Sequence, residues 1–374
     1  MILPPATLGM LGGGQLGRYF VMAAHRLGYK VVVQDPDPAS IAGAAADHHI
    51  VAAYDDPTAL HDLASRCAAV TCEFENVPAT ALALLEQYQP VRPAAGAVRI
   101  CQDRREEKAF LSRAGIPVAP NQTLQPGEPL PELPDDLFPA ILKTAREGYD
   151  GKGQWTIQSA DQLPAALAAS GVPCVLEKRL PLEGEFALTL ARSPSGAIGA
   201  LPLVQNWHSG GILDQTRSPA NVPALEADAR RIAEQLIAAL DYVGVLTVEF
   251  FLVAGKLLVN ELAPRPHNSG HPSLDNAECS QFELQVRALC DLPLPARIAV
   301  RPAMLLNLLG DLWQAGTPDW AALLALPGVH LHLYGKGEPR PGRKMGHVTI
   351  TAADWPTVEE TCQRVRQLLG LPPR

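Results

Sequence analysis

The sequence lacks long apolar stretches, continuous blocks of basic residues and closely paired cysteines. No run approaches the roughly 20 apolar residues of a membrane-spanning helix, and the first residues have no basic segment typical of a secretion signal. The net charge is −8, which argues against nucleic acid as a partner and favours a small molecule. The 7 cysteines form no C-x-x-C pair, so reduced thiols explain them best. We therefore expect a soluble cytoplasmic protein that binds neither membranes nor nucleic acid.

The chain length and the spacing of apolar residues predict several domains, the first of them built on a parallel sheet. With 374 residues, 47% of them hydrophobic, the chain can bury two or three cores. Short apolar strands alternate with helical runs over the first hundred residues, a pattern typical of βαβ units. The expected strands cover residues 7–11, 30–34 and 68–72, and the expected helices cover residues 15–27, 57–66 and 78–87.

A glycine-rich turn follows the first expected strand. Gly12, Gly14 and Gly17 form G-x-G-x-x-G, and Asp35 follows the next strand, as in the dinucleotide-binding fingerprint. A complete dinucleotide fold needs a second mononucleotide-binding half, whereas here the alternation stops after a charged helix at residues 103–113. An NAD-dependent oxidoreductase remains an alternative, and the single half-Rossmann unit argues against it.

The remaining two thirds of the chain predict mixed α and β structure. Residues 117–139 carry several prolines and predict an irregular crossing. We expect helices at residues 160–169, 224–240 and 358–369, strands near residues 186–191, 197–204, 304–307, 330–334 and 347–351, and a hairpin over residues 245–262.

The segment "KTAREGYDGKGQ" has the composition of a loop that covers phosphates. Lys143 ends an apolar strand, and Gly148, Gly151 and Gly153 lie among charged residues. Flexible backbone N–H groups and cations suit a polyphosphate, and a loop between two strands can close as a lid. The G-K-[ST] of a Walker A motif is absent, and a solvated hairpin loop is the alternative.

The segment "VEFFLVAGKLLVNEL" predicts a hairpin that carries two carboxylates. Glu249 lies opposite Glu261 if the turn is centred on Gly255, with a three-residue loop over residues 254–256. With Asn260 adjacent, the two acids offer the hard oxygen ligands that Mg²⁺ takes when it also binds substrate phosphates. The alternative is that each glutamate pairs with an arginine or lysine.

Two further loops are rich in hydrogen-bond donors. The segment "APRPHNSGH" suits an oxyanion or a reactive acyl phosphate beside a metal ion. Its polar residues are Arg265, His267, Asn268, Ser269 and His271. The segment "YGKGEPRPGRKMGH" concentrates positive charge in an acidic protein and predicts a monophosphate site. Its basic residues are Lys336, Arg340, Arg343 and Lys344. Polar surface loops are the alternative for both segments.

These motifs give the chain a whole-length resemblance to ATP-grasp ligases. In particular, it resembles the N5-carboxyaminoimidazole ribonucleotide synthetase family, whose motifs occur in the same order. They are "GGGQLGR", "CEFENVP", "GYDGKGQ", "VEFF", "NELAPRPHNSGH", "CSQFE" and "RPGRKMGH". The resemblance implies an ATP-grasp fold of the α/β and α+β class in a homodimer. The implied domains are a half-Rossmann pre-ATP-grasp domain over residues 1–105, an ATP-grasp domain over 106–295 with a lid lobe at about 115–180, and a C-terminal domain over 296–374.

The resemblance also implies which residues bind each ligand. ATP would contact Arg104, Lys143, Gly148, Tyr149, Asp150, Gly151, Lys152, Gly153, Gln154, Glu177, Lys178, Arg179, Leu180, Glu185, His208, Asn260 and Glu261. The ribonucleotide would contact Gly14, Gln15, Leu16, Glu73, Asn76, Asp150, Asn268, Ser269, Lys336, Arg343 and Lys344. Glu249 and Glu261 would hold Mg²⁺, and the catalytic residues would be Tyr149, Asp150, Arg265 and His267.

The implied reaction is the ATP- and bicarbonate-dependent carboxylation of 5-aminoimidazole ribonucleotide in purine biosynthesis. Bicarbonate would attack the γ-phosphate of ATP to give carboxyphosphate and ADP, and a closed lid would exclude water from this intermediate. The glycine turn would then shape the substrate cleft without holding a dinucleotide cofactor. The main alternatives are a formate-dependent glycinamide ribonucleotide transformylase or another ATP-grasp ligase, and an inactive binding module that has kept the fold.

Overall fold

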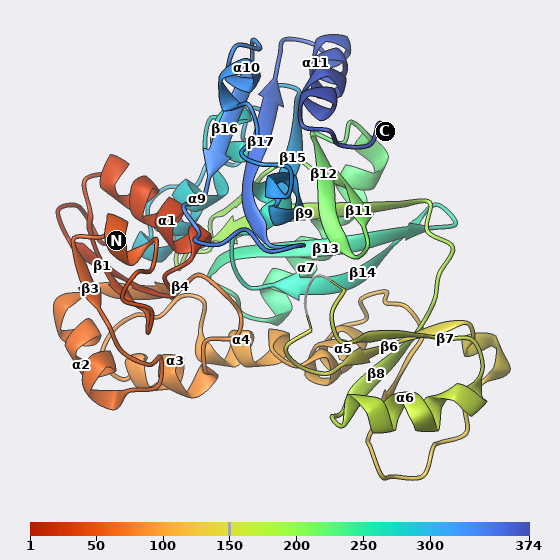
Figure 1. The fold of residues 1–374 in the computed structure, drawn as a ribbon. Helices are drawn as coiled ribbons and strands as arrows, with labels where there is room; N and C mark the ends of the chain where they lie inside the picture. The colour runs from red at the N-terminus through yellow and green to blue at the C-terminus, as the bar shows by residue number, and fades with distance from the viewer. Residues whose placement is uncertain (149–150) are drawn as a thin grey trace.

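The structure is a computed structural model that describes residues 1–148 and 151–374 and contains three β-sheets (Figure 1). The N-terminal sheet is parallel, with the strand order β3-β2-β1-β4. Its strands are β1 (Thr7–Leu11), β2 (Lys30–Gln34), β3 (His48–Ile50) and β4 (Ala69–Cys72), and its helices are α1 (Gln15–Arg26), α2 (Pro57–Arg66), α3 (Ala79–Leu85) and α4 (Ala95–Cys101). The predicted βαβ alternation is confirmed, while β3 and α4 were not predicted.

A smaller antiparallel sheet forms the lobe that follows α5 (Arg104–Arg113). Its order is β5-β8-β6-β7, and its elements are β5 (Asn121–Leu124), β6 (Ala140–Thr144), β7 (Gln154–Ile157), β8 (Cys174–Lys178) and α6 (Leu163–Ser170). Leu163 and Leu167 of α6 pack on Leu142 of β6. The irregular crossing predicted for residues 117–139 is wrong in part, because β5 lies inside it. Only one β5 side chain, Leu124, is buried, so the strand gives little apolar pattern.

The largest sheet has nine strands, all paired antiparallel. The strands are β9 (Gly184–Arg192), β10 (Ile198–Ala200), β11 (Val204–Ser209), β12 (Ile212–Ser218), β13 (Gly244–Val253), β14 (Lys256–Ala263), β15 (Ala303–Leu309), β16 (Val329–Leu333) and β17 (Lys344–Thr351). Its helices are α7 (Pro223–Ala239), α8 (Ser273–Asn276), α9 (Gln281–Cys290), α10 (Trp320–Leu324) and α11 (Trp355–Leu368). The β12–β15 pairing joins the C-terminal strands to the same sheet.

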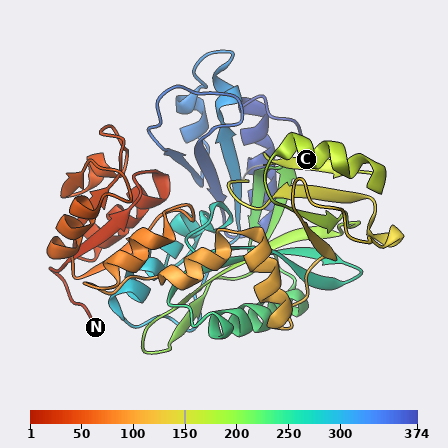
Figure 2. The same ribbon diagram turned by 90° about the horizontal axis from the view of Figure 1, so that it is seen from below.

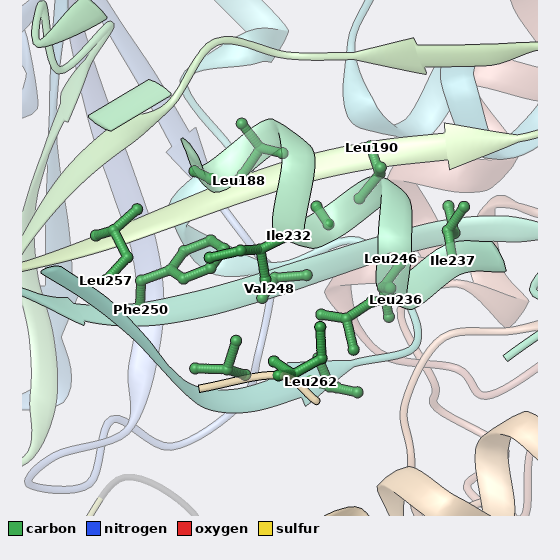
Figure 3. Close-up of a cluster of buried hydrophobic side chains, with 14 of the residues drawn as sticks. Leu188, Leu190, Ile232, Leu236, Ile237, Leu246, Val248, Phe250, Leu257 and Leu262 are labelled. Carbon is green, nitrogen blue, oxygen red and sulfur yellow. The ribbon is translucent and has the colours of Figure 1, made fainter. Parts of the chain in front are cut away.

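Helix α7 and strands β9 and β13 form the core beneath the site. Figure 3 shows Ile232 and Leu236 of α7 beside Val248 of β13, all buried. Each large aliphatic side chain that is fully buried contributes roughly 1.5–3 kcal/mol. This core therefore gives β13 a firm position from which to present polar residues on its other face.

The β13–β14 hairpin has the predicted pairing of Glu249 with Glu261 but a different turn. Val253 pairs directly with Lys256, so the loop contains two residues, Ala254 and Gly255, and the predicted three-residue loop is wrong. Both loop residues have positive φ angles, as a type I′ turn requires, and such turns match the twist of the strands. The register shifts between Glu249 and Phe250, so a β-bulge restores the opposition of the two acids.

The N-terminal unit and the β5–β8 lobe lie on opposite sides of the molecule in both views (Figures 1 and 2). The C-terminal strands and α11 form a third projection. Among the residues that the structure describes, no helix is both long and apolar enough to cross a membrane.

Candidate functional site

A cavity of about 750 Å³ lies between the small lobe and the large sheet. Twelve of the residues predicted to contact ATP line it: Arg104, Lys143, Gly151, Gln154, Glu177, Lys178, Arg179, Leu180, Glu185, His208, Asn260 and Glu261. Gly148 and Lys152 line a second cavity instead, Gly153 lines neither, and Tyr149 and Asp150 lie outside the described residues. Sequence reasoning missed an apolar group on the wall: Pro139, Ile141, Pro181, Leu182, Leu213 and Phe251. These side chains add apolar surface to the wall of the first cavity, which suits a planar base.

A buried group of charges forms the floor of the first cavity. The Lys143 Nζ atom lies 2.8 Å from one Glu177 carboxylate oxygen, and the Lys108 Nζ atom lies 3.5 Å from the other. Burial raises the pKa of Glu177, but these two ammonium groups outweigh burial and lower that pKa to about 2. Lys108 was not predicted, although it follows Arg104 by one helical turn on α5 and therefore shares its face. The floor keeps two cations beside a cavity that is large enough for a nucleotide.

The two acids of the hairpin line this cavity together, and each has a partner from another segment. An Arg104 guanidinium nitrogen lies 2.9 Å from a Glu261 oxygen, and His267 Nε2 lies 3.2 Å from a Glu249 oxygen. The alternative that each glutamate pairs with an arginine or lysine therefore holds for Glu261, because Arg104 reaches it from α5. Burial and the neighbouring Glu261 raise the pKa of Glu249. Burial also raises the pKa of Glu261, but Arg104 outweighs it and holds that pKa below its ordinary value.

The acid pair fits a divalent cation on its geometry and charge. Glu249 and Glu261 are direct partners on neighbouring strands, so their carboxylates share one face. The Asn260 Oδ1 atom beside them is buried and has no hydrogen-bond partner among the described residues. Two carboxylates that share a site repel each other, and Mg²⁺ accepts a few carboxylates together with phosphate oxygens. The pair could therefore hold Mg²⁺ once a nucleotide supplies the other oxygens.

The loop after β14 holds His267 in a fixed orientation. The His267 Nδ1 atom lies 2.9 Å from the Ser269 hydroxyl, and the Gln281 side chain makes two 2.8 Å hydrogen bonds with the His267 backbone. Burial and the nearby Arg265 guanidinium keep the pKa of His267 well below its ordinary value, so this imidazole is neutral. Gln281 was not predicted, although it belongs to the "CSQFE" motif. It positions the loop from α9.

Arg265, in the same loop, pairs with an acid outside the β13–β14 hairpin. Its guanidinium forms an ion pair with Glu75, from the segment after β4. Arg265, Glu75 and the predicted substrate residue Asn76 line a small cavity of about 50 Å³. Arg265 also lines the second large cavity, so it is placed to contact a ligand there.

His208 and Glu185 form another pair in the first cavity. The His208 Nδ1 atom lies 2.9 Å from a Glu185 carboxylate oxygen. Burial lowers the pKa of His208, but the bond to Glu185 outweighs it and raises that pKa above its ordinary value. Glu185, rather than Glu183, lines this cavity, and Glu183 instead accepts a hydrogen bond from the Gly255 backbone at 3.0 Å.

The second cavity, of about 660 Å³, adjoins the first and opens toward the N-terminal unit. The predicted substrate residues on its wall are Gln15, Leu16, Glu73, Asn268, Lys336, Arg343 and Lys344. Arg340 and Arg265 add to its positive charge, and Phe74, Glu75 and His271 are further wall residues that had no predicted substrate role. Gly14, Asn76 and Ser269 do not line this cavity.

The two large cavities share part of their walls. The shared residues are Glu261, His267, Asn268 and Lys344. Both amide atoms of Asn268 are buried without a hydrogen-bond partner among the described residues. An unpartnered buried amide is unfavourable, and a ligand between the cavities could pair with it. A group transferred between ligands in the two cavities would pass this shared wall.

The glycine turn is already filled by side chains of this chain. The N–H groups of Gly14 and Gly17 donate to the Glu73 carboxylate at 2.5 and 2.6 Å, and Gly13 donates to Asp35 at 2.6 Å. In a dinucleotide site these donors face the pyrophosphate and the acid faces the ribose. Two carboxylates in this position would repel a phosphate, so the turn supports the second cavity and gives no support to an NAD site.

Comparison with known proteins agrees with this geometry. Three family models match consecutive segments: the ribonucleotide synthetase preATP-grasp domain over residues 5–102, the ATP-grasp domain over 109–282 and the phosphoribosylaminoimidazole carboxylase C-terminal domain over 303–361. The N5-carboxyaminoimidazole ribonucleotide synthase of Brucella melitensis biotype 1 is 43% identical over 352 residues, covering 92% of this chain and 96% of that protein.

Solved structures show the same likeness. An ADP complex of an N5-carboxyaminoimidazole ribonucleotide synthetase is 39% identical, with a TM-score of 0.91 over 98% of this chain and 97% of that one. The Aspergillus clavatus N5-carboxyaminoimidazole synthase, in complex with ADP and 5-aminoimidazole ribonucleotide, is 30% identical, with a TM-score of 0.85 over 98% of each chain. Since the likeness extends over nearly the full length of each protein, the chain belongs to the N5-carboxyaminoimidazole ribonucleotide synthase family of ATP-grasp ligases.

Proposed function

We propose that this chain carboxylates 5-aminoimidazole ribonucleotide with ATP and bicarbonate, and that the two adjoining cavities hold the two nucleotides. ATP occupies the first cavity, with its base against the apolar side chains of the wall and its phosphates toward Lys143 and Arg104. The ribonucleotide occupies the second cavity, with its 5′-phosphate near Lys336 and Arg343. The observation that carries the proposal is the wall that the cavities share.

Glu249 and Glu261 are the residues that would hold Mg²⁺. When bound, Mg²⁺ neutralises charge on the β- and γ-phosphates during phosphoryl transfer. Asn260 offers a further oxygen at the β-bulge. Lys143 donates to a phosphate oxygen and thereby stabilises the charge that develops as ADP leaves.

Bicarbonate binds at the shared wall and attacks the γ-phosphorus. A new P–O bond forms, the bond to the β-phosphate oxygen breaks, and carboxyphosphate and ADP result. His267, neutral and held by Ser269, orients bicarbonate, and Arg265 supplies positive charge from the second cavity. Carboxyphosphate then loses phosphate as carbon dioxide forms, the exocyclic amine attacks the carbon, and the amine gives up a proton.

The segment around Gly148 to Gln154, which includes Tyr149 and Asp150, acts as a lid over both ligands in this proposal. Gly148 and Lys152 line the second cavity while Gly151 and Gln154 line the first, which supports contact with both. A lid matters because carboxyphosphate hydrolyses readily in water. We propose further that the protein is a cytoplasmic homodimer with domains over residues 1–105, 106–295 and 296–374.

Incorporation of labelled bicarbonate tests the proposed function. With ATP, Mg²⁺, 5-aminoimidazole ribonucleotide and ¹³C-bicarbonate, the ribonucleotide gains one ¹³C carbamate signal for each ADP formed. The Glu249→Gln variant gives neither product above background. ADP formation that requires formate and glycinamide ribonucleotide would instead identify the transformylase, and the absence of ADP with every substrate pair would contradict both readings.

A further inference from the structure

A cluster of imidazoles and one carboxylate lies behind the second cavity, outside the proposed reaction. His332 on β16 pairs directly with His347 on β17, so both side chains project from the same face of the sheet. Asp275 of α8 lies against that face, and its Oδ2 atom is 2.9 Å from His332 Nε2. One ligand atom from each of the three residues lies within 4.8 Å of the other two.

The second observation is an orphaned nitrogen on His347. This side chain is fully buried, and its Nε2 atom has no hydrogen-bond partner among the described residues. Its Nδ1 atom is 2.9 Å from the Tyr334 hydroxyl. When Nδ1 carries the proton and donates a hydrogen bond to the Tyr334 hydroxyl oxygen, Nε2 keeps a free lone pair, which is the arrangement found in histidines that bind metals. A buried imidazole nitrogen without a partner is unfavourable unless something binds it.

The surroundings suit a metal ion that enters from solvent. His332 lines a cavity of about 250 Å³ together with Glu278, Glu283 and Arg26, so this cavity gives an ion a route from solvent to the cluster. His330, two residues earlier on the same face of β16, lies 3.7 Å from the second Asp275 oxygen and is not one of the three grouped ligands.

We propose that Asp275, His332 and His347 bind a divalent transition metal ion of the Zn²⁺ type. Two imidazoles and one carboxylate suit Zn²⁺ and related ions, whereas Mg²⁺ prefers oxygen ligands alone. Tetrahedral Zn²⁺ places its ligand atoms roughly 3.4 Å apart. Because the three ligand atoms lie within 4.8 Å of one another, they close by at most about 1.4 Å when the ion binds. The His332 and His347 rings, which stack with centroids 4.4 Å apart and planes at 13°, tilt so that both lone pairs meet the ion. The site is separate from the Glu249 and Glu261 pair.

Metal binding would join two parts of the chain. Asp275 belongs to the segment that follows the donor-rich loop, whereas the histidines belong to the C-terminal strands. The His347 ring centroid also lies 5.0 Å from that of His271, which lines the second cavity. An ion here would therefore stiffen the wall behind the ribonucleotide and raise the unfolding temperature.

Calorimetric titration of the metal-free full-length protein with Zn²⁺ tests the site. We expect one tight equivalent of Zn²⁺, no comparable heat from Mg²⁺, and at least a tenfold loss of affinity in both Asp275→Asn and His332→Asn. The control is His25→Asn. His25 Nε2 lies 2.8 Å from an Asp47 oxygen, and this pair belongs to no group of three possible metal ligands among the described residues. The His25→Asn variant should therefore bind Zn²⁺ as the wild type does.

Two further measurements make the result decisive. An anomalous difference map recorded at the zinc edge should show its peak between Asp275 and His347, and Glu249→Gln should retain the tight equivalent. Unchanged Zn²⁺ affinity in both Asp275→Asn and His332→Asn, or a peak elsewhere, would overturn the proposal. In that case the Asp275–His332 pair serves only to hold the two segments together.

Discussion

The carboxylate of Glu249 should destabilise the nucleotide-free protein, and its removal should show by how much. Burial and the adjacent Glu261 raise its pKa from 4.5 to about 7. A pKa change of that size corresponds to about 3 kcal/mol in the free energy of unfolding. Because the folded state holds this proton more tightly than the unfolded state, stability falls as pH rises from about 4.5 to 7 and then levels off. Glu249→Gln lacks this penalty, since a neutral amide needs no ionisation.

Urea denaturation of both proteins across this pH range measures the effect. The free energy of unfolding of Glu249→Gln, relative to wild type, should increase by about 3 kcal/mol between pH 4.5 and pH 8. Glu360→Gln, a change at an exposed acid of α11, is the control and should give a flat difference. The gain in stability of Glu249→Gln comes with a loss of ligand binding. Mg²⁺ with ATP should raise the unfolding temperature of the wild type but not that of Glu249→Gln. A flat difference between wild type and Glu249→Gln would refute the argument that the acid pair is repulsive without a cation.

Two further variants test the lid and the cavity floor. Gly153→Ala places a Cβ atom 2.6 Å from the Thr144 hydroxyl oxygen. The control is Gly127→Ala, because Gly127 also has a positive φ but has open space around it. Gly153→Ala should lower the unfolding free energy by about 1–3 kcal/mol more than Gly127→Ala does, and equal losses in urea denaturation would show that backbone strain alone matters. Lys143→Met should weaken ATP binding roughly 10- to 100-fold by calorimetry, because a charge-assisted hydrogen bond is lost. The wild type should lose stability as the pH falls from about 4.5 to 2, because the pKa of Glu177 is depressed in the folded state, and Lys143→Met should make this loss smaller. An equal loss of stability in both proteins over this pH range would show that Lys143 does not lower the pKa of Glu177.

Local patterns predicted much of the fold. The alternation of strands and helices gave the parallel sheet, and the apolar runs gave the β13–β14 hairpin. Helix α9 was missed because most of its residues are buried, including Gln281 and Gln285, so its polar side chains do not mark a solvent face. The hairpin shows a subtler failure, since a bulge contributes the same extra residue as a longer turn and the sequence does not distinguish the two.

The site was predictable where each motif carries its own chemistry, and not where distant segments meet. Arg104 was expected to touch ATP, but its ion pair with Glu261 spans 157 positions. The ion pair of Arg265 with Glu75 spans 190 positions, and no local sequence pattern predicts either contact. The same holds for the glycine turn, whose donors face Glu73 from a later strand end. Such contacts are set by packing of whole sheets, which spacing along the chain does not specify.

The central claim is that bicarbonate, rather than water, attacks the γ-phosphate at the wall between the two cavities. Turnover with ¹⁸O-bicarbonate in unlabelled water measures this directly, because an oxygen of the attacking group stays on phosphorus when carboxyphosphate breaks its C–O bond. Mass spectrometry should find inorganic phosphate that carries one ¹⁸O atom whenever the ribonucleotide is carboxylated. Unlabelled phosphate formed in step with the carboxylated product would contradict the account.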